Sequence, residues 1–192
     1  GYSSEVKGYN VTNSYTPEQT SVQVTKAWAD ANNQDGVRPE SVTVTLVADG
    51  VATEETLTLT ETNNWTGTFT ELDKYKDGTE IVYTVEELEL ENGYEPVITG
   101  DATTGYVITN TKTPEVIEVA GSKTWDDADN QDGKRPESIT IRLLANGTEV
   151  DSLEVTAEEW AWSFTDLPKY ENGKEITYTI TEDAIEGYSA TV

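Results

Sequence analysis

A lysine, a glutamate and an asparagine occupy positions of three expected strands where the neighbouring side chains are apolar. Strand residues alternate between faces, so Lys26 shares a face with Val24 and Trp28 and should point into the core. On later strands the same alternation places Glu87 on an apolar face and directs Asn110 inward. A lysine in a dry interior is costly unless it is paired or neutral; the alternatives are a buried ion pair and an amine that reaches the edge of the core. The three residues are therefore candidates for chemistry between an amine, an acid and a carboxamide.

These residues belong to an internal repeat that organises the chain. The run Lys26-Ala27-Trp28 recurs 97 positions later as Lys123-Thr124-Trp125, and a Gln-Asp-Gly block and an Arg-Pro-Glu-Ser block follow at the same offset. In the later part of each copy the offset is 95, which matches Glu87 with Glu182. A period of this length is a whole domain, so we expect two tandem copies of one small domain.

The elements that position these residues are expected to be short β-strands. Residues 21–27, 41–47, 55–60 and 80–86 alternate apolar and polar side chains and are rich in Val, Ile and Thr. Asp-Gly and Asn-Gly pairs supply the positive-φ positions of hairpin turns, and no window shows sustained helical periodicity. The predicted fold class is all-β, with two tandem Ig-like β-sandwiches.

The ends of the chain do not coincide with the ends of the repeat. Residues 8–17 match residues 105–114, which close the first copy, whereas the second copy stops before its last strand. We therefore expect residues 1–17 to be the last strand, or the last two strands, of a preceding repeat. Residues 18–114 would form a complete domain, and residues 115–192 a second domain that lacks its final strand.

Composition argues against several classes of function. The 192 residues include 37 acidic and 12 basic side chains, a formal charge of −25, so nucleic acid and anionic membrane surfaces would repel the chain. No Cys and no His are present, which removes disulfides and the usual ligands and bases of metal and triad chemistry. We expect no metal, no cofactor and no turnover catalysis. No segment has the length and hydropathy of a membrane span, and neither end has the pattern of a signal peptide or anchor.

Several blocks in a fixed order resemble a known family. Lys-x-Trp, Asp-Gly-x-Arg-Pro-x-Ser, Trp…Phe…Leu…Tyr, Tyr-Thr-Val-x-Glu and Ile-Thr-Asn resemble the B-type repeats of the staphylococcal collagen adhesin, the CnaB family. The resemblance covers nearly the whole chain. It implies an Ig-like sandwich of reversed strand topology, used as stalk repeats in Gram-positive surface adhesins and pilins. It also implies a spontaneous isopeptide bond between Lys26 and Asn110, promoted by the acid Glu87; in the second copy Lys123 and Glu182 match.

The implied chemistry suits buried residues of these types. Burial lowers the pKa of a lysine and raises that of a carboxyl group, so Lys26 can attack the side-chain carbonyl of Asn110 as a neutral amine. Protonated Glu87 would stabilise the developing negative charge and pass a proton to the departing ammonia. The reaction happens once per domain, so it is autocatalytic maturation and the protein is not an enzyme. A cross-link that needs no oxidant suits a surface stalk under tension.

The N-terminal segment offers a strand to the second copy. It contains Asn13, the counterpart of Asn110, while the second copy has Lys123 and Glu182 but no asparagine of its own. If the sandwiches lie end to end, completion within one molecule is disfavoured. We therefore expect head-to-tail strand donation, with a bond from Lys123 to Asn13 of another chain. The alternative is a chain boundary placed within a domain, with a ragged N-terminal segment.

The remaining features support weaker interpretations. The acidic loops at residues 30–35 and 126–132 resemble calcium loops, but the ligand spacing fails, so solvated acidic turns are preferred. The leading function is a structural stalk module, extracellular and attached to the cell wall through its parent protein, with neighbouring repeats as partners. The alternative is a ligand-binding adhesin domain for a host protein or glycan, which an exposed aromatic patch would favour.

Overall fold

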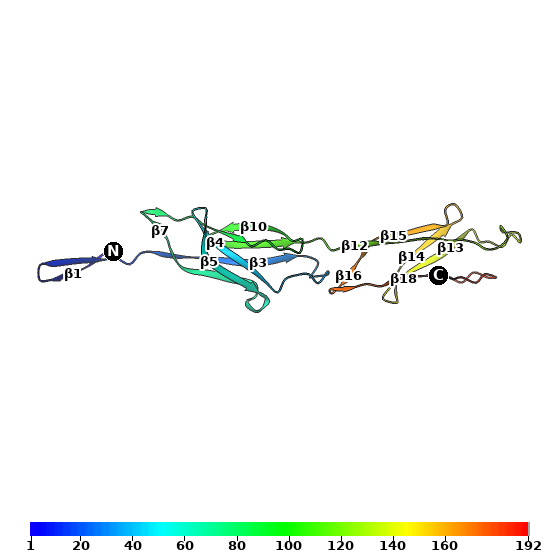
Figure 1. Cartoon of the computed structure of the whole chain (residues 1–192), viewed down its shortest axis with the longest axis horizontal. Coiled ribbons are helices and arrows are strands. Elements are labelled where there is room, and N and C mark those ends of the chain that lie inside the picture. The colour runs from blue at the N-terminus through cyan, green and yellow to red at the C-terminus, as the bar shows by residue number, and fades with distance from the viewer. Residues whose placement is uncertain (192) are drawn as a thin grey trace. The chain divides into compact units, whose positions relative to one another are not determined.

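The computed structural model describes residues 1–191, and almost all of its regular structure is β-strand (Figure 1). Its one helical element within that range is the short 3-10 turn η1 (Glu61–Asn63). The chain divides into two compact units: Gly1–Asn32 with Arg38–Lys112, and Asn33–Val37 with the residues from Thr113 onward. The predicted all-β class with tandem sandwiches is confirmed. In the described part of the chain, no helix has the length and apolar character needed to cross a membrane.

The first unit is built from two sheets. The larger has the order β10 (Glu95–Asp101), β11 (Gly105–Thr111), β3 (Gln19–Ala29), β6 (Thr66–Asp73), and the smaller has the order β5 (Val51–Thr60), β4 (Ser41–Ala48), β9 (Tyr83–Glu87). A separate ribbon pairs β7 (Tyr75–Lys76) with β8 (Thr79–Glu80). Only the β3–β11 pair of the larger sheet is parallel, so the first and last strands of the domain run side by side in one direction.

The strand expected at residues 80–86 begins later than predicted. Regular pairing with β4 starts at Tyr83. The amide of Ile81 donates to the carbonyl of Lys74, and the amide of Val82 donates to the side chain of Asp49. These hydrogen bonds hold the two residues in a connection that follows the β7–β8 ribbon, outside the sheet.

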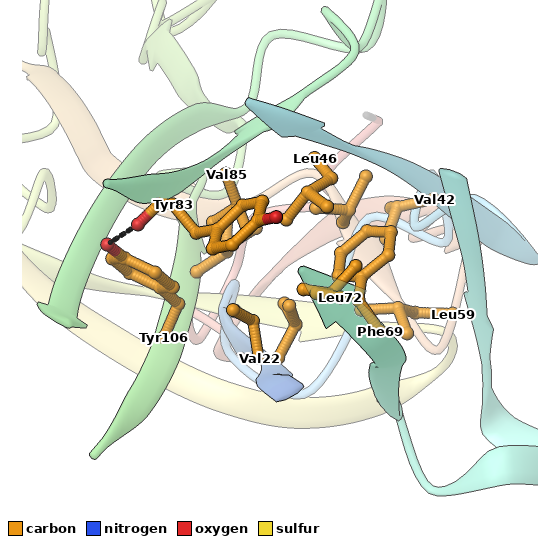
Figure 2. Close-up of a cluster of buried hydrophobic side chains, with 12 residues drawn as sticks. Val22, Val42, Leu46, Leu59, Phe69, Leu72, Tyr83, Val85 and Tyr106 are labelled. Carbon is orange, nitrogen blue, oxygen red and sulfur yellow. Dashed lines mark hydrogen bonds between the residues drawn. The ribbon is translucent and has the colours of Figure 1, made fainter. Parts of the chain in front are cut away.

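The core of the first unit lies between its two sheets. Figure 2 shows side chains from both sheets meeting in one cluster, where the Tyr106 hydroxyl donates to the carbonyl of Tyr83 at 2.9 Å. On β3 the alternation buries Val22 and Val24, and then Lys26 in the same register. A core this rich in β-branched and aromatic side chains favours strands over helices.

The second unit repeats this plan with fewer strands. One sheet pairs β12 (Val116–Ser122) with β15 (Ala161–Pro168), and the other has the order β14 (Thr148–Thr156), β13 (Ser138–Ala145), β18 (Tyr178–Glu182). The ribbon of β16 (Tyr170–Glu171) and β17 (Lys174–Glu175) corresponds to β7–β8. Within residues 1–191, β12 pairs only with β15. In the first unit β11 pairs with the other edge of β3, and no described strand takes that place beside β12.

The N-terminal segment forms a hairpin of β1 (Ser3–Lys7) and β2 (Asn10–Ser14), in which every residue is exposed. The sequence predicted the last strand or two of a preceding repeat in this segment, and the chain forms two strands here. Asn13 lies opposite Ser4, as Asn110 lies opposite Pro96 in the β10–β11 hairpin. The turn is shorter, because Gly8 and Tyr9 close it directly.

Most of the predicted hairpin turns have the backbone conformation that their Asp-Gly or Asn-Gly pair favours. Type I′ turns need positive φ at both central residues. Both residues have positive φ in four of the five predicted pairs, namely Asp49-Gly50, Asp77-Gly78, Asn146-Gly147 and Asn172-Gly173. In the fifth, Asn92-Gly93, only the glycine does.

A cross-strand pair differs between the copies in a compensating way. Val24 of β3 lies opposite Gly67 of β6, whereas Gly121 of β12 lies opposite Trp162 of β15. A Cβ atom on Gly121 would lie 2.5 Å from the indole of Trp162. In the first unit the larger side chain of the pair lies on β3, whereas in the second unit it lies on β15. Glycine is therefore required at position 121, opposite Trp162.

We predict that Gly121→Val destabilises the second unit by about 1–3 kcal/mol through overpacking. Adding Trp162→Gly, which recreates the pair of the first unit, should recover part of that loss. Chemical unfolding followed by hydrogen exchange in peptides of β12 and β15 measures both effects. Equal stability of Gly121→Val and the parent chain would contradict the prediction.

Candidate functional site

Lys26, Glu87 and Asn110 meet inside the first unit. Lys26 is 4% exposed and Asn110 is fully buried. The Lys26 Nζ atom lies 3.3 Å from Glu87 Oε2, and Asn110 Nδ2 donates to Glu87 Oε1 at 2.5 Å. The amine and the carboxamide therefore contact the two oxygens of one carboxyl group. The structure brings together all three residues predicted for the first copy.

Strand register explains this meeting. Lys26 lies beside Ile108 in the parallel β3–β11 pair, and its Nζ atom donates to the Ile108 carbonyl at 3.3 Å. Asn110 follows two positions later, so it points to the same face. Glu87 is the last residue of β9 in the opposite sheet, so its carboxyl group faces both across the core.

Burial dominates the electrostatics of the amine. Desolvation lowers the pKa of Lys26 from 10.5 to about 8, although the charge and hydrogen bonding of Glu87 and the charge of Asp30 act to raise it. The lowered pKa increases the fraction of Lys26 that carries a neutral amine at a given pH. The neutral, nucleophilic form is thus available near physiological pH.

The carboxamide of Asn110 has an unsatisfied group. Its Oδ1 atom is buried and has no hydrogen-bond partner among the described residues, while Nδ2 donates to Glu87. Turning the carboxamide by half a rotation would bring Oδ1 to Glu87, where a protonated carboxyl group could donate to it. The site therefore permits an arrangement in which the acid polarises the carbonyl.

In the second unit the amine and the acid are paired without an asparagine. Lys123 Nζ lies 2.8 Å from Glu182 Oε2. Glu182 Oε1, the counterpart of the oxygen that binds Asn110, is buried and has no hydrogen-bond partner among residues 1–191. Lys123 and Glu182 line a cavity of about 680 Å³ beside β12. The Lys123 side chain is 17% exposed, against none for Lys26. Asn13 is exposed on β2, so the structure does not bring it to this site.

The acidic loop after β3 was wrongly predicted to be solvated throughout. Asp30 is 4% exposed and Asp35 is 8% exposed. Asp30 accepts two hydrogen bonds from Arg38, at 2.9 and 2.6 Å, and one from the Tyr94 hydroxyl at 2.8 Å. A sequence clue existed, because Asp30 continues the inward alternation of Lys26 and Trp28.

One family matches most of the chain. The Cna protein B-type domain matches residues 22–111 and 119–192. A protein named collagen adhesin from Staphylococcus aureus is 48% identical over 192 residues, which is 100% of this chain and 16% of that protein.

A solved structure of two repeats gives the same relation. The crystal structure of two B repeat units (B1B2) of the collagen binding protein (Cna) of S. aureus matches with a TM-score of 0.83 and 48% identity, covering 100% of this chain and 52% of that one. A single B repeat unit (B1) of the same protein is 36% identical over 90% of both chains, with a TM-score of 0.45. The chain thus spans about half of the two-repeat structure.

Proposed function

Because the chain belongs to the Cna protein B-type domain family, we propose that it is a stalk segment of a Gram-positive cell-surface adhesin, locked by an isopeptide bond. The observation that carries the proposal is the buried meeting of an amine and a carboxamide at one carboxyl group. The stalk would lie outside the cell, attached to the wall through its parent protein.

The reaction joins Lys26 to Asn110. The neutral amine attacks Cγ of Asn110, forming a C–N bond, and the bond from Cγ to Nδ2 breaks. Glu87 stabilises the carbonyl oxygen as charge develops, and carries the amine proton to the departing nitrogen, which leaves as ammonia. The chain therefore loses one ammonia for each bond formed, and an intact mass equal to the full sequence mass would refute the proposal.

The position of the bond suits a load-bearing stalk. Lys26 and Asn110 lie on the first and last strands of the sandwich, which are paired in parallel. Tension that enters along β3 and leaves along β11 would pass through the cross-link, and the residues between would carry little of it. The chain contains no Cys, so a disulfide could not do this.

We further propose that the second unit receives its asparagine from another copy of the sequence. Three observations support donation of the β1–β2 hairpin. In the part of the chain that the structure describes, Glu182 Oε1 has no hydrogen-bond partner and one edge of β12 has no neighbouring strand. Asn13 is paired in its hairpin as Asn110 is in β10–β11. A Lys123–Asn13 bond, promoted by Glu182, would link neighbouring repeats or separate chains head to tail.

A denaturing gel tests this second bond. A chain with Lys123→Ala can only donate, and one with Asn13→Ala can only accept, so their mixture should yield covalent dimers and nothing longer. The unaltered chain should give a ladder. Asn10→Ala, an exposed change on the same strand, should leave the ladder intact. A single monomer band under every condition would exclude the covalent linkage.

The alternative function as a ligand-binding domain has one supporting feature. Tyr2, Tyr9 and Tyr15 are exposed aromatic residues on or beside the hairpin. We assign them to strand donation, because the hairpin shares its sequence and register with β10–β11. The name of the relative, collagen adhesin, describes the whole of that protein, and the chain spans only 16% of it.

A further inference from the structure

Asp30, Arg38 and Tyr94 form a hydrogen-bonded group beside the isopeptide site, which we call the aspartate clamp. The carboxylate accepts three hydrogen bonds, all between 2.6 and 2.9 Å, from the other two members. Desolvation and the bond to Asp30 raise the pKa of Tyr94, so its hydroxyl remains a donor at any physiological pH. The clamp ties the loop after β3 to the segment that leads into β10.

Two members of the clamp contact the ring of Trp28. Tyr94 packs edge-on against the ring with centroids 5.0 Å apart, and Trp65 does so at 5.1 Å. The Arg38 guanidinium lies 5.2 Å from the ring centroid. The Lys26 Nζ atom lies 4.5 Å from the same centroid. The indole therefore contacts the reactive amine, two members of the clamp and the ring of Trp65.

We propose that Trp28, held by the aspartate clamp, is a positioning residue that covers the amine of Lys26 and keeps water from it. Solvent at the amine would favour the ammonium form, which cannot attack a carbonyl. Cation–π attraction to the ring acts in the opposite sense, because it favours the charged amine. Burial is the leading cause of the lowered pKa of Lys26, and the ring of Trp28 is part of the surroundings that bury the amine.

The second unit contains the same arrangement without a strand over its lysine in the described residues. Asp127 accepts from Arg135 at 3.0 and 2.5 Å and from Tyr188 at 3.0 Å. Trp125 packs edge-on against Tyr188 at 5.1 Å, and Lys123 Nζ lies 4.7 Å from its centroid. The clamp is therefore present in a unit whose described residues include no counterpart of the asparagine strand.

The charged groups near Lys26 come from two elements. Glu87 reaches it from β9 and Asp30 from the loop after β3, and both raise its pKa. Arg38 pairs with Asp30 and offsets part of that negative charge. The clamp therefore holds the ring of Trp28 in place. Its arginine also limits the negative charge of Asp30, which would otherwise keep the amine of Lys26 protonated.

This inference rests on the proposed isopeptide bond and is tested by its pH profile. The chain is synthesised in a cell-free reaction, quenched in denaturant and refolded at several values from about pH 6 to pH 10, and loss of ammonia is followed by mass. In the parent chain, the rate of bond formation should rise with pH as Lys26 loses its proton, and it should reach half its maximum near pH 8. Trp28→Ala should move this midpoint towards 10.5 and slow bonding at pH 7 by about tenfold or more.

Three further variants distinguish the proposed role of Trp28 from a folding defect. Tyr94→Phe keeps the ring and removes one hydrogen bond from the clamp, so it should shift the midpoint in the same direction by less. Trp28→Phe should restore most of the parent profile, and Trp125→Ala in the second unit should leave the Lys26 bond unchanged. Parent-like profiles in Tyr94→Phe and in folded Trp28→Ala would overturn the inference. Full mass in the parent chain would instead refute the bond itself.

Discussion

Replacing Asn110 by alanine will lower the melting temperature of the first unit by roughly 15–40 °C. The bond from Lys26 to Asn110 closes a loop of most of the domain, and the loop-entropy relation gives about 4–5 kcal/mol for a loop of that length. In a domain of about 100 residues each kcal/mol corresponds to about 4–8 °C. Differential scanning calorimetry of the whole chain, with the second unit as internal reference, measures the shift.

Asn110→Asp is the matched control for this prediction. A protonated aspartate can condense with the amine by loss of water, so the variant should be lighter by one water and keep most of its stability. Asn110→Ala also removes a buried hydrogen bond to Glu87, worth about 1 kcal/mol and hence only a few degrees. A shift of that smaller size in Asn110→Ala would mean that no cross-link had been lost.

Glu87→Gln will leave Lys26 and Asn110 unbonded in nearly every molecule. Glutamine has the size of glutamate and can still donate to the carboxamide, but it can neither release nor accept a proton at neutral pH. Loss of general acid–base catalysis slows a reaction by about 10²–10⁴-fold. Intact mass of the freshly purified variant should therefore retain the ammonia that the parent chain loses.

The internal repeat supplies the control for this change. Glu182→Gln alters the matching position of the second unit, so the Lys26–Asn110 bond should form as in the parent chain. Complete loss of ammonia in Glu87→Gln would show that Glu87 only pairs with the amine in the folded state. The assignment of the acid would then have to be abandoned.

Alternation along single strands was enough to predict where the reactive side chains point. On β3 the sequence places Lys26 between Val24 and Trp28, and the structure buries it there. The same pattern on β11 predicted an inward Asn110. These predictions succeed because a two-residue period is a local property of extended backbone. That both strands lie next to each other was available only through the family resemblance.

The aspartate clamp could not be predicted because its members are distant in sequence. Tyr94 reaches Asp30 across 64 positions, and its role depends on the path of the chain between β9 and β10. Local composition instead suggested a solvated acidic turn, since four of six residues from 30 to 35 are Asp or Asn. Burial of such a carboxylate requires partners, and only the folded chain shows that Arg38 and Tyr94 supply them.

The exchange of the large side chain between the two copies also could not be predicted from the alternation of strand residues. Gly121 occupies the register position of Val24, which by itself suggests a weaker strand. The structure shows that Trp162 fills the space from the opposite strand. Pairing register decides this compensation, and register follows from sheet assembly and not from either strand alone.

Tandem mass spectrometry of a proteolytic digest tests the central claim most directly. If the isopeptide bond forms, the segments that contain Lys26 and Asn110 will appear as one branched peptide, lighter than their sum by one ammonia. The fragment ions will place the junction at those two side chains. Two separate linear peptides with full masses, from a natively folded chain, would contradict the account.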